Sequence, residues 1–169
     1  MPQKTNILRS QGRIADIAFG RGGSIFLTGA IHKIGFVAKL GPRGFPVAGF
    51  GKNAVRMLHG SRMPIPKYLW PKDPKAAGIG ISPDGSLVVT GYSRPTCNPK
   101  WGCFHPLLVK KLRPNGTIDR GFERRAYRDL RAFPEAVGQD VYFHGNKPLV
   151  TGSIEFAPSR SKFMVARLK

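Results

Sequence analysis

One short pattern recurs along this chain and limits its possible folds more than any other feature. It is an apolar run that closes on Thr-Gly, and it occupies residues 23–29, 85–91 and, in shortened form, 149–152. The second Thr-Gly lies 62 positions after the first, and the third lies 61 positions after the second. Self-similarity at a nearly constant period is typical of repeat architectures. We therefore expect three copies of one structural unit.

A second apolar run follows in each copy, at residues 36–40, 108–112 and 163–168. After each of the first two runs, the same four residues recur at a single shift of 72 positions: Pro42, Gly44, Gly49 and Phe50, then Pro114, Gly116, Gly121 and Phe122. Chance matches are common in a chain with 21 Gly and 15 Pro. Four matches at one shift, flanked by matching apolar runs, indicate a true repeat.

Each copy has the local chemistry of a small antiparallel meander. Short apolar runs bounded by Gly, Pro, Asn and Asp predict strands. The sequences at 83–85 and 113–116 predict tight turns, because Pro presets φ and Asn or Gly accepts positive φ. One such meander is too small to be stable alone. We expect an all-β fold of three four-stranded antiparallel blades, with inner strands at 14–19, 76–82 and 137–143, second strands at 24–30, 86–92 and 148–154, third strands at 35–40, 107–113 and 162–168, and outer strands at 52–58 and 124–131.

The length predicts a single domain over residues 1–169. Its repeats are expected at about 11–58, 76–131 and 134–169, with an irregular insertion at 59–75. The third copy has no outer strand of its own, whereas a spare strand is expected at 4–9, before the first copy. That spare strand is available to complete the last blade.

The second copy, residues 84–91 and 109–122, resembles the delta-60 repeat of β-propeller proteins. It has the Asp-Gly turn, the strand that ends in Gly, the Asn-Gly turn, and the closing Asp and Gly-Phe. The first copy departs from this pattern at Arg43 and Pro46, and the third departs at Lys147-Pro148. The resemblance implies a propeller, either incomplete or completed by an oligomer. It carries no characteristic catalytic residues, so we expect a non-catalytic module that serves as a binding or assembly scaffold and not as an enzyme.

The charge suggests an alternative function. Lys and Arg outnumber acids 28 to 9, for a formal net charge of +19. Such a balance favours anionic partners or simply solubility. A basic RNA- or ribonucleoprotein-associated protein is therefore the second hypothesis. Its candidate anion- or nucleic-acid-binding residues are Lys110, Lys111, Arg113, Arg124, Arg125, Arg128 and Arg131. In an outer strand, the run at 124–131 would also protect a sheet edge, which is the interpretation we favour.

The cysteines and histidines give a weaker signal. Cys97 and Cys103 predict a local disulfide or a pair of free thiols. A zinc site needs four ligands, and only His105 stands nearby in sequence. His32 or His144 would have to arrive from a neighbouring blade, so we expect no metal and no cofactor. The nine acids show no pairing suited to general acid–base catalysis.

Three blades are fewer than the four to eight of typical propellers. We expect two exposed apolar flanks, covered in a homodimer that exchanges the strand at 4–9, or by another propeller-completing protein. No window holds the roughly 18 apolar residues of a membrane span. The first residues lack the apolar run of a signal peptide. This predicts a cytoplasmic protein if Met1 is the native start.

Overall fold

The computed structural model describes residues 11–59, 72–94, 96–98, 102–104, 106–130, 136–157 and 160–168. The expected strand at 4–9 lies outside these residues, as does the part of the expected insertion from 60 to 71. The last residues of that insertion, from Lys72 onward, belong to a strand instead.

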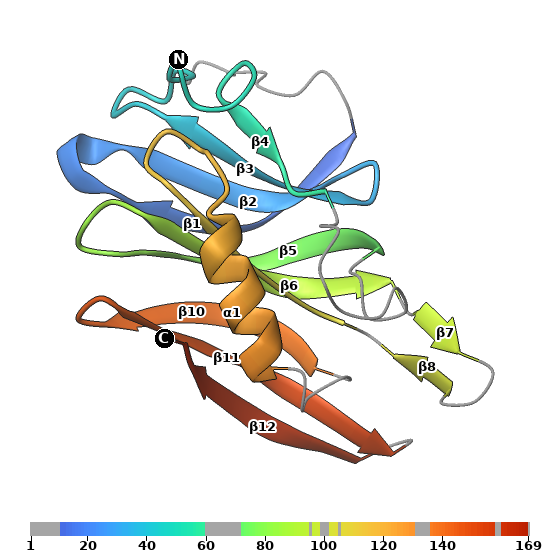
Figure 1. Ribbon diagram of the computed structural model, residues 1–169. Helices are drawn as coiled ribbons and strands as arrows, with labels where there is room; N and C mark the ends of the chain where they lie inside the picture. Colours follow the sequence, from blue (N-terminus) through green and yellow to red (C-terminus); the bar gives the residue numbers. More distant parts are fainter. Residues whose placement is uncertain are drawn as a thin grey trace.

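The described chain is mostly β and forms three antiparallel sheets that are stacked in chain order (Figure 1). The first sheet contains β1 (Gly12–Phe19), β2 (Ile25–Ile31), β3 (Ile34–Leu40) and β4 (Val55–Met57), in that order. The second contains β5 (Lys72–Ile81), β6 (Leu87–Arg94) and β9 (Leu107–Leu112). The third contains β10 (Ala136–His144), β11 (Lys147–Ala157) and β12 (Arg160–Arg167). The remaining elements are a 3-10 turn η1 (Arg21–Gly23), a two-stranded ribbon of β7 (Thr96–Asn98) and β8 (Gly102–Phe104), and a helix α1 (Arg120–Leu130).

The recurring Thr-Gly pair has the same structural role in each sheet. Thr28, Thr90 and Thr151 each lie opposite a point where the register of the first strand shifts by one residue. Such a bulge brings two residues of one strand against one residue of its partner. A Cβ on the following glycine would collide with the backbone carbonyl oxygen of the bulged strand, in all three copies. Close backbone approach therefore explains why Gly follows Thr.

The turns after β3 and β9 are equivalent bond by bond. Gly41 N donates to Phe45 O at 2.8 Å and Gly44 N donates to Gly41 O at 2.9 Å. At the same shift of 72 positions, Arg113 N donates to Thr117 O and Gly116 N donates to Arg113 O, both at 2.8 Å. The matching sequences of these two turns thus form matching hydrogen bonds.

The turn before β6 has the predicted Asp-Gly chemistry. Gly85 has φ +80°, in the left-handed region that Gly accepts without steric cost. The Asp84 carboxylate accepts a hydrogen bond from Ser86 N at 2.8 Å. This bond holds the pKa of Asp84 below its ordinary value.

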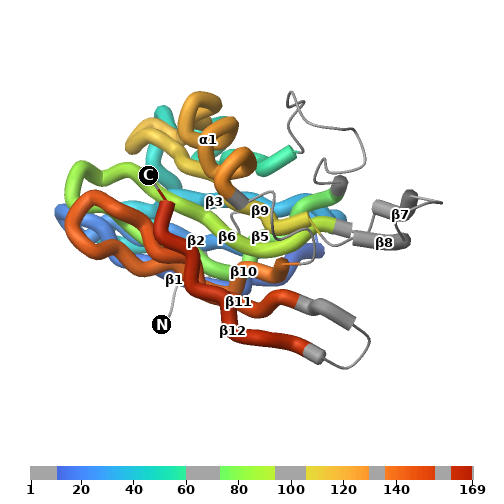
Figure 2. Tube along the Cα trace, turned by 60° about the horizontal axis from the view of Figure 1, so that its bottom comes forward, coloured from blue at the N-terminus to red at the C-terminus, as the bar shows by residue number. Residues whose placement is uncertain are grey.

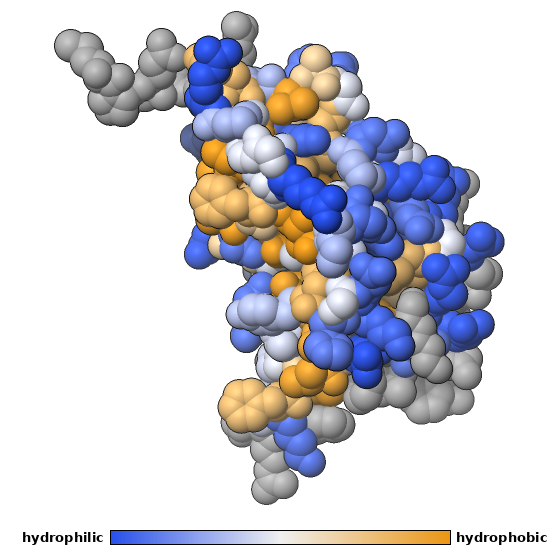
Figure 3. Space-filling model, turned by 90° about the vertical axis from the view of Figure 1, so that its left-hand side faces the viewer, coloured by the Kyte–Doolittle hydropathy of each residue, from blue (hydrophilic) through white to orange (hydrophobic). Residues whose placement is uncertain are grey.

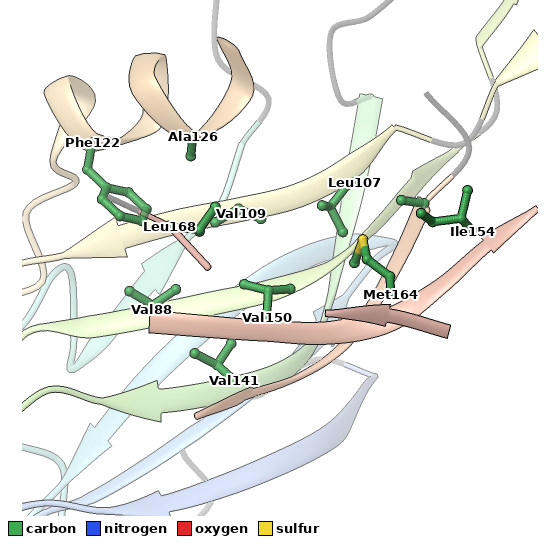
Figure 4. Packing of buried hydrophobic residues seen from close by; sticks show 11 residues of the cluster. Val88, Leu107, Val109, Phe122, Ala126, Val141, Val150, Ile154, Met164 and Leu168 are labelled. Atoms are coloured by element: carbon green, nitrogen blue, oxygen red, sulfur yellow. The ribbon is translucent and has the colours of Figure 1, made fainter. Parts of the chain in front are cut away.

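The second sheet is covered on both faces, because it lies between the other two. Residues 87–89 of β6 and 107–109 of β9 are at most 4% exposed. One apolar cluster fills the space toward the first sheet: Phe26, Val37, Phe50, Leu58, Ala76, Ile79, Leu87, Val89, Leu108 and Leu112. Another fills the space toward the third sheet (Figure 4): Val88, Leu107, Val109, Phe122, Ala126, Ala136, Val141, Val150, Ile154, Met164 and Leu168.

The first strands of the three sheets lie together, since β5 contacts both β1 and β10. At the bulge of β1, Asp16 Oδ2 accepts a hydrogen bond from Ile79 N of β5 at 2.9 Å. This bond ties neighbouring sheets to each other through their first strands.

The expected outer strand at 124–131 is wrong, because residues 120–130 form the helix α1. The Asp119 carboxylate accepts a hydrogen bond from Phe122 N at 2.9 Å and so caps the amino end of the helix. The buried residues Phe122, Glu123, Ala126 and Tyr127 repeat at helical spacing. The first sheet does have its fourth strand, β4, at the expected place.

The close approach at Thr-Gly gives a stability prediction. We expect Gly91→Ala to lower the free energy of unfolding by at least about 2 kcal/mol, because its Cβ collides with a backbone oxygen of Lys75 that cannot move independently. Gly41→Ala is the matched control, since its nearest neighbouring atom would be 3.8 Å away. Urea denaturation followed by circular dichroism measures both. Equal stability of the two variants would contradict the assigned role of the glycine.

Candidate functional site

Helix α1 is held on the second sheet by a buried ion pair. Lys110 Nζ of β9 lies 2.6 Å from Glu123 Oε1, and the two side chains are 0% and 3% exposed. Removal from water lowers the pKa of Lys110, and the neighbouring Glu123 carboxylate opposes that shift. Two buried charges that satisfy each other fix the position of the helix, because either charge alone would be costly to bury.

A hydrogen bond from β9 to the helix replaces a bond that a fourth strand would make. Tyr127 Oη accepts a hydrogen bond from Val109 N of β9 at 3.4 Å. In the first sheet, the equivalent residue Val37 is paired with Arg56 of β4. Burial raises the pKa of Tyr127, so the hydroxyl stays protonated. The helix thereby covers the edge of β9 that a fourth strand covers in the first sheet.

The outward side of α1 is strongly basic. Arg120, Arg124 and Arg128 follow one another at intervals of four residues, which places them on one stripe of the helix, and Arg125 lies beside them. All four are exposed. We call these four residues the arginine face. Helix α1 lies on the side of the molecule away from β1 and β10 (Figure 2). Asp129 is the exposed acid beside the arginine face, with Oδ1 3.5 Å from Arg128 Nε.

The structure separates the predicted anion-binding residues. Arg124, Arg125 and Arg128 lie together on the arginine face, and Arg113 is exposed in the turn after β9. Lys111 is half-buried, with Nζ 6.0 Å from the centre of the Phe122 ring.

One predicted residue does not belong to this surface. Lys110 was a wrong choice, because it is fully buried against Glu123. Arg131 lies outside the described residues. Arg120 was missed, and the helical interval of four residues before Arg124 is the signal that would have found it. The prediction that residues 124–131 protect a sheet edge as a charged outer strand was also wrong, since these residues belong to or follow a helix that covers the edge of β9.

The cysteines stand at paired backbone positions of the β7–β8 ribbon. Cys97 and Cys103 are register partners. Directly opposed residues in antiparallel strands have Cα atoms about 4.5 to 5.5 Å apart, which is within the range of a disulfide. The disulfide stays a prediction. Among the residues that the structure describes, no group of three or more His, Cys, Asp and Glu side chains is placed to hold a metal ion. His105 lies outside them.

Comparisons with known proteins leave the chain without an assigned family. No family model matches the sequence, and a search of curated proteins finds no match. No helix in the described part of the chain combines the length and apolar character that crossing a membrane requires.

The buried pair predicts a large asymmetry between variants. Glu123→Ala leaves the Lys110 ammonium buried without its charge partner, so we expect a loss of about 3 to 5 kcal/mol in the free energy of unfolding. The double variant Lys110→Met/Glu123→Leu should recover most of that loss, because no charge is then buried. Asp129→Ala, which removes the exposed ion pair, should cost less than about 1 kcal/mol. If Glu123→Ala and Asp129→Ala lost equal stability in thermal unfolding, the anchoring role would be refuted.

Proposed function

We propose that this chain is a non-catalytic binding and assembly module, formed by three blades of a β-propeller-type ring that a second copy of the chain completes. Two features support the proposal. The bulge, the Thr-Gly pair and the turn bonds recur from copy to copy, as expected for units related by a regular rotation. The second copy also resembles the delta-60 repeat of propeller proteins.

The observation that carries the proposal is the exposure of Val165. The register pairs Val37 with Thr28, Val109 with Thr90 and Val165 with Thr151, so these valines occupy equivalent positions. Val37 and Val109 are 0% exposed because each faces the next sheet. Val165 is 70% exposed. The third sheet thus presents the type of face that the first two sheets bury.

The neighbouring Phe163 has the same character. It pairs with Ser153, two residues beyond Thr151, whereas the equivalent Leu107 pairs with Tyr92. Leu107 is 4% exposed and Phe163 is 99% exposed. We call the face that carries Tyr142, Phe163 and Val165 the last terminal face.

The first sheet exposes the complementary face. Its side away from the second sheet carries Ile14, Ile17 and Phe19 of β1, which are 57%, 49% and 72% exposed. We call it the first terminal face. It is also partly buried, at Ile31, Phe36 and Ala38. In the side view of Figure 3, apolar groups gather mainly along one flank of the visible surface and hydrophilic groups cover much of the other.

A second copy is the occupant that suits both terminal faces. Within the chain, each sheet packs the side that carries Val37 or Val109 against the opposite side of the next sheet. The last terminal face of one copy can therefore pack against the first terminal face of another copy in the same way as neighbouring sheets pack within one chain. Two copies related by a twofold axis make this contact twice and close a ring of about six blades, a common propeller size.

The closed ring predicts a dimer in solution. Light scattering should give twice the 18.5 kDa mass of one chain at micromolar concentration. Phe163→Glu/Val165→Asp should convert it to a monomer, because buried charges on the last terminal face would lack partners. Phe45→Glu is the matched control, since Phe45 is 49% exposed and lies in the turn after β3, not in a strand of either terminal face. A stable wild-type monomer would refute self-assembly and favour completion by another protein.

A second candidate function is binding of single-stranded nucleic acid through the arginine face. Four exposed arginines on one rigid helix provide a concentrated positive surface. Arg forms bidentate bonds to phosphate. The ion pair beneath the helix keeps this surface in place, since Glu123 satisfies Lys110 and leaves the outward charges to solvent.

Salt dependence tests this second function. For a labelled single-stranded oligonucleotide, Arg124→Ala/Arg125→Ala/Arg128→Ala should weaken affinity at least tenfold at about 50 mM salt. The slope of log affinity against log salt should fall by about 2 units, because fewer counterions are released. Arg21→Ala is the matched control, an exposed arginine in η1. Undetectable binding by the wild type at low salt would exclude this function.

A further inference from the structure

A basic cleft lies between the first and second sheets, apart from the arginine face. It has a volume of ≈ 500 Å³ and is formed by the start of β1, the β2–β3 turn, β5 and the end of β6. No residue of α1 or β9 lines it. Its small residues, Gly12, Ala15, Ala30 and Ala77 among them, leave the space open. The volume lies in the range of small-molecule sites, about 300 to 1,000 Å³.

The polar side chains around the cleft are mostly cationic. Arg13, Lys33 and Lys75 line it together with His32 and Tyr92. None of the described lining residues is acidic. Three positive charges around one cleft concentrate the field on a bound anion.

Two of these side chains are positioned at a conformational cost. His32 and Lys33 form the two-residue turn between Ile31 and Ile34, with φ +46° and +73°. Hairpin turns of this type favour Gly, Asn and Asp, because other side chains are strained at positive φ. Here the turn instead places an imidazole and an ammonium at the rim of the cleft.

The opposite wall carries an aromatic contact. Lys75 Nζ lies 5.7 Å from the centre of the Tyr92 ring. Lys75 is half-buried, whereas Arg13 and Lys33 are exposed. The half-buried charge lies where a ligand would exclude water, so its attraction for an anion is screened less than that of a surface lysine.

We propose that this cleft binds a small organic phosphate, with the phosphate group held by Arg13, Lys33 and Lys75. Three cations suit a dianion better than a single carboxylate, and the guanidinium of Arg13 matches the geometry of phosphate oxygens. The space exceeds that of a bare phosphate ion, and Tyr92 and the alanines offer contacts to the organic part. The group comes from a free mononucleotide or from the 5′ end of a nucleic acid.

Calorimetry with adenosine 5′-monophosphate tests the site. The nucleotide should bind the full chain, and uncharged adenosine should bind at least tenfold more weakly. Arg13→Ala/Lys75→Ala should lower affinity by about tenfold to a hundredfold, the loss that follows from removing charged hydrogen bonds. Arg21→Ala should change it less than about twofold. Equal losses in the two variants, or no binding at millimolar nucleotide, would overturn the proposal.

Lys33→Gly separates binding from folding. It removes a cation and also relieves the strained turn, so we expect a higher thermal midpoint together with weaker nucleotide binding. A variant that gains stability and keeps full affinity would show that Lys33 does not contribute to the site.

In the Arg124→Ala/Arg125→Ala/Arg128→Ala background, a 5′-phosphorylated tetranucleotide distinguishes the source of the phosphate. Tighter binding than the mononucleotide, lost with Arg13→Ala/Lys75→Ala, assigns the site to nucleic-acid ends, and weaker binding assigns it to free nucleotides.

Discussion

Each sheet of this protein carries apolar side chains on both faces, and the rest of the structure depends on that constraint. A three- or four-stranded sheet with two apolar faces is not stable in water alone, so each must pack against a neighbour. The second sheet fulfils this need within the chain, and Leu87, Val88 and Val89 are all 0% exposed. The first and third sheets fulfil it on one side only. Their terminal faces are the direct physical reason to propose a second copy.

The second sheet has a helix where the first sheet has a fourth strand, and its other three strands are arranged in the same way. Its β9 edge is covered by α1, and the hydroxyl of Tyr127 accepts the bond from the Val109 N–H. The Lys110–Glu123 pair then fixes the helix in the place of a strand. A strand would have alternated its side chains between two faces. The helix instead gathers Arg120, Arg124, Arg125 and Arg128 on one exposed side.

The basic residues of the chain therefore have different structural roles. Lys110 serves packing, the arginine face forms one exposed surface, and Arg13, Lys33 and Lys75 surround a separate cleft. These two basic regions differ in shape, since one is convex and helical and the other is a hollow between sheets. A convex basic surface suits an extended polyanion, whereas a cleft suits a small one. Their tests use different ligands and different variants, so the two proposals can fail independently.

The amino-acid sequence by itself determined the mostly β fold, most strands and the turns, because turn residues and strand-forming runs act locally. The shift of 72 positions reappears as equivalent bonds at Gly41 and Arg113. The sequence did not reveal that Lys110 is buried or that residues 120–130 are helical. Lys110 and Lys111 are adjacent charges in the strand pattern, and only the packing around β9, with the Lys110–Glu123 pair, buries one and leaves the other half-exposed. The cleft was equally hidden, since Arg13, Lys33 and Lys75 are distant in sequence and meet only because the first two sheets pack together.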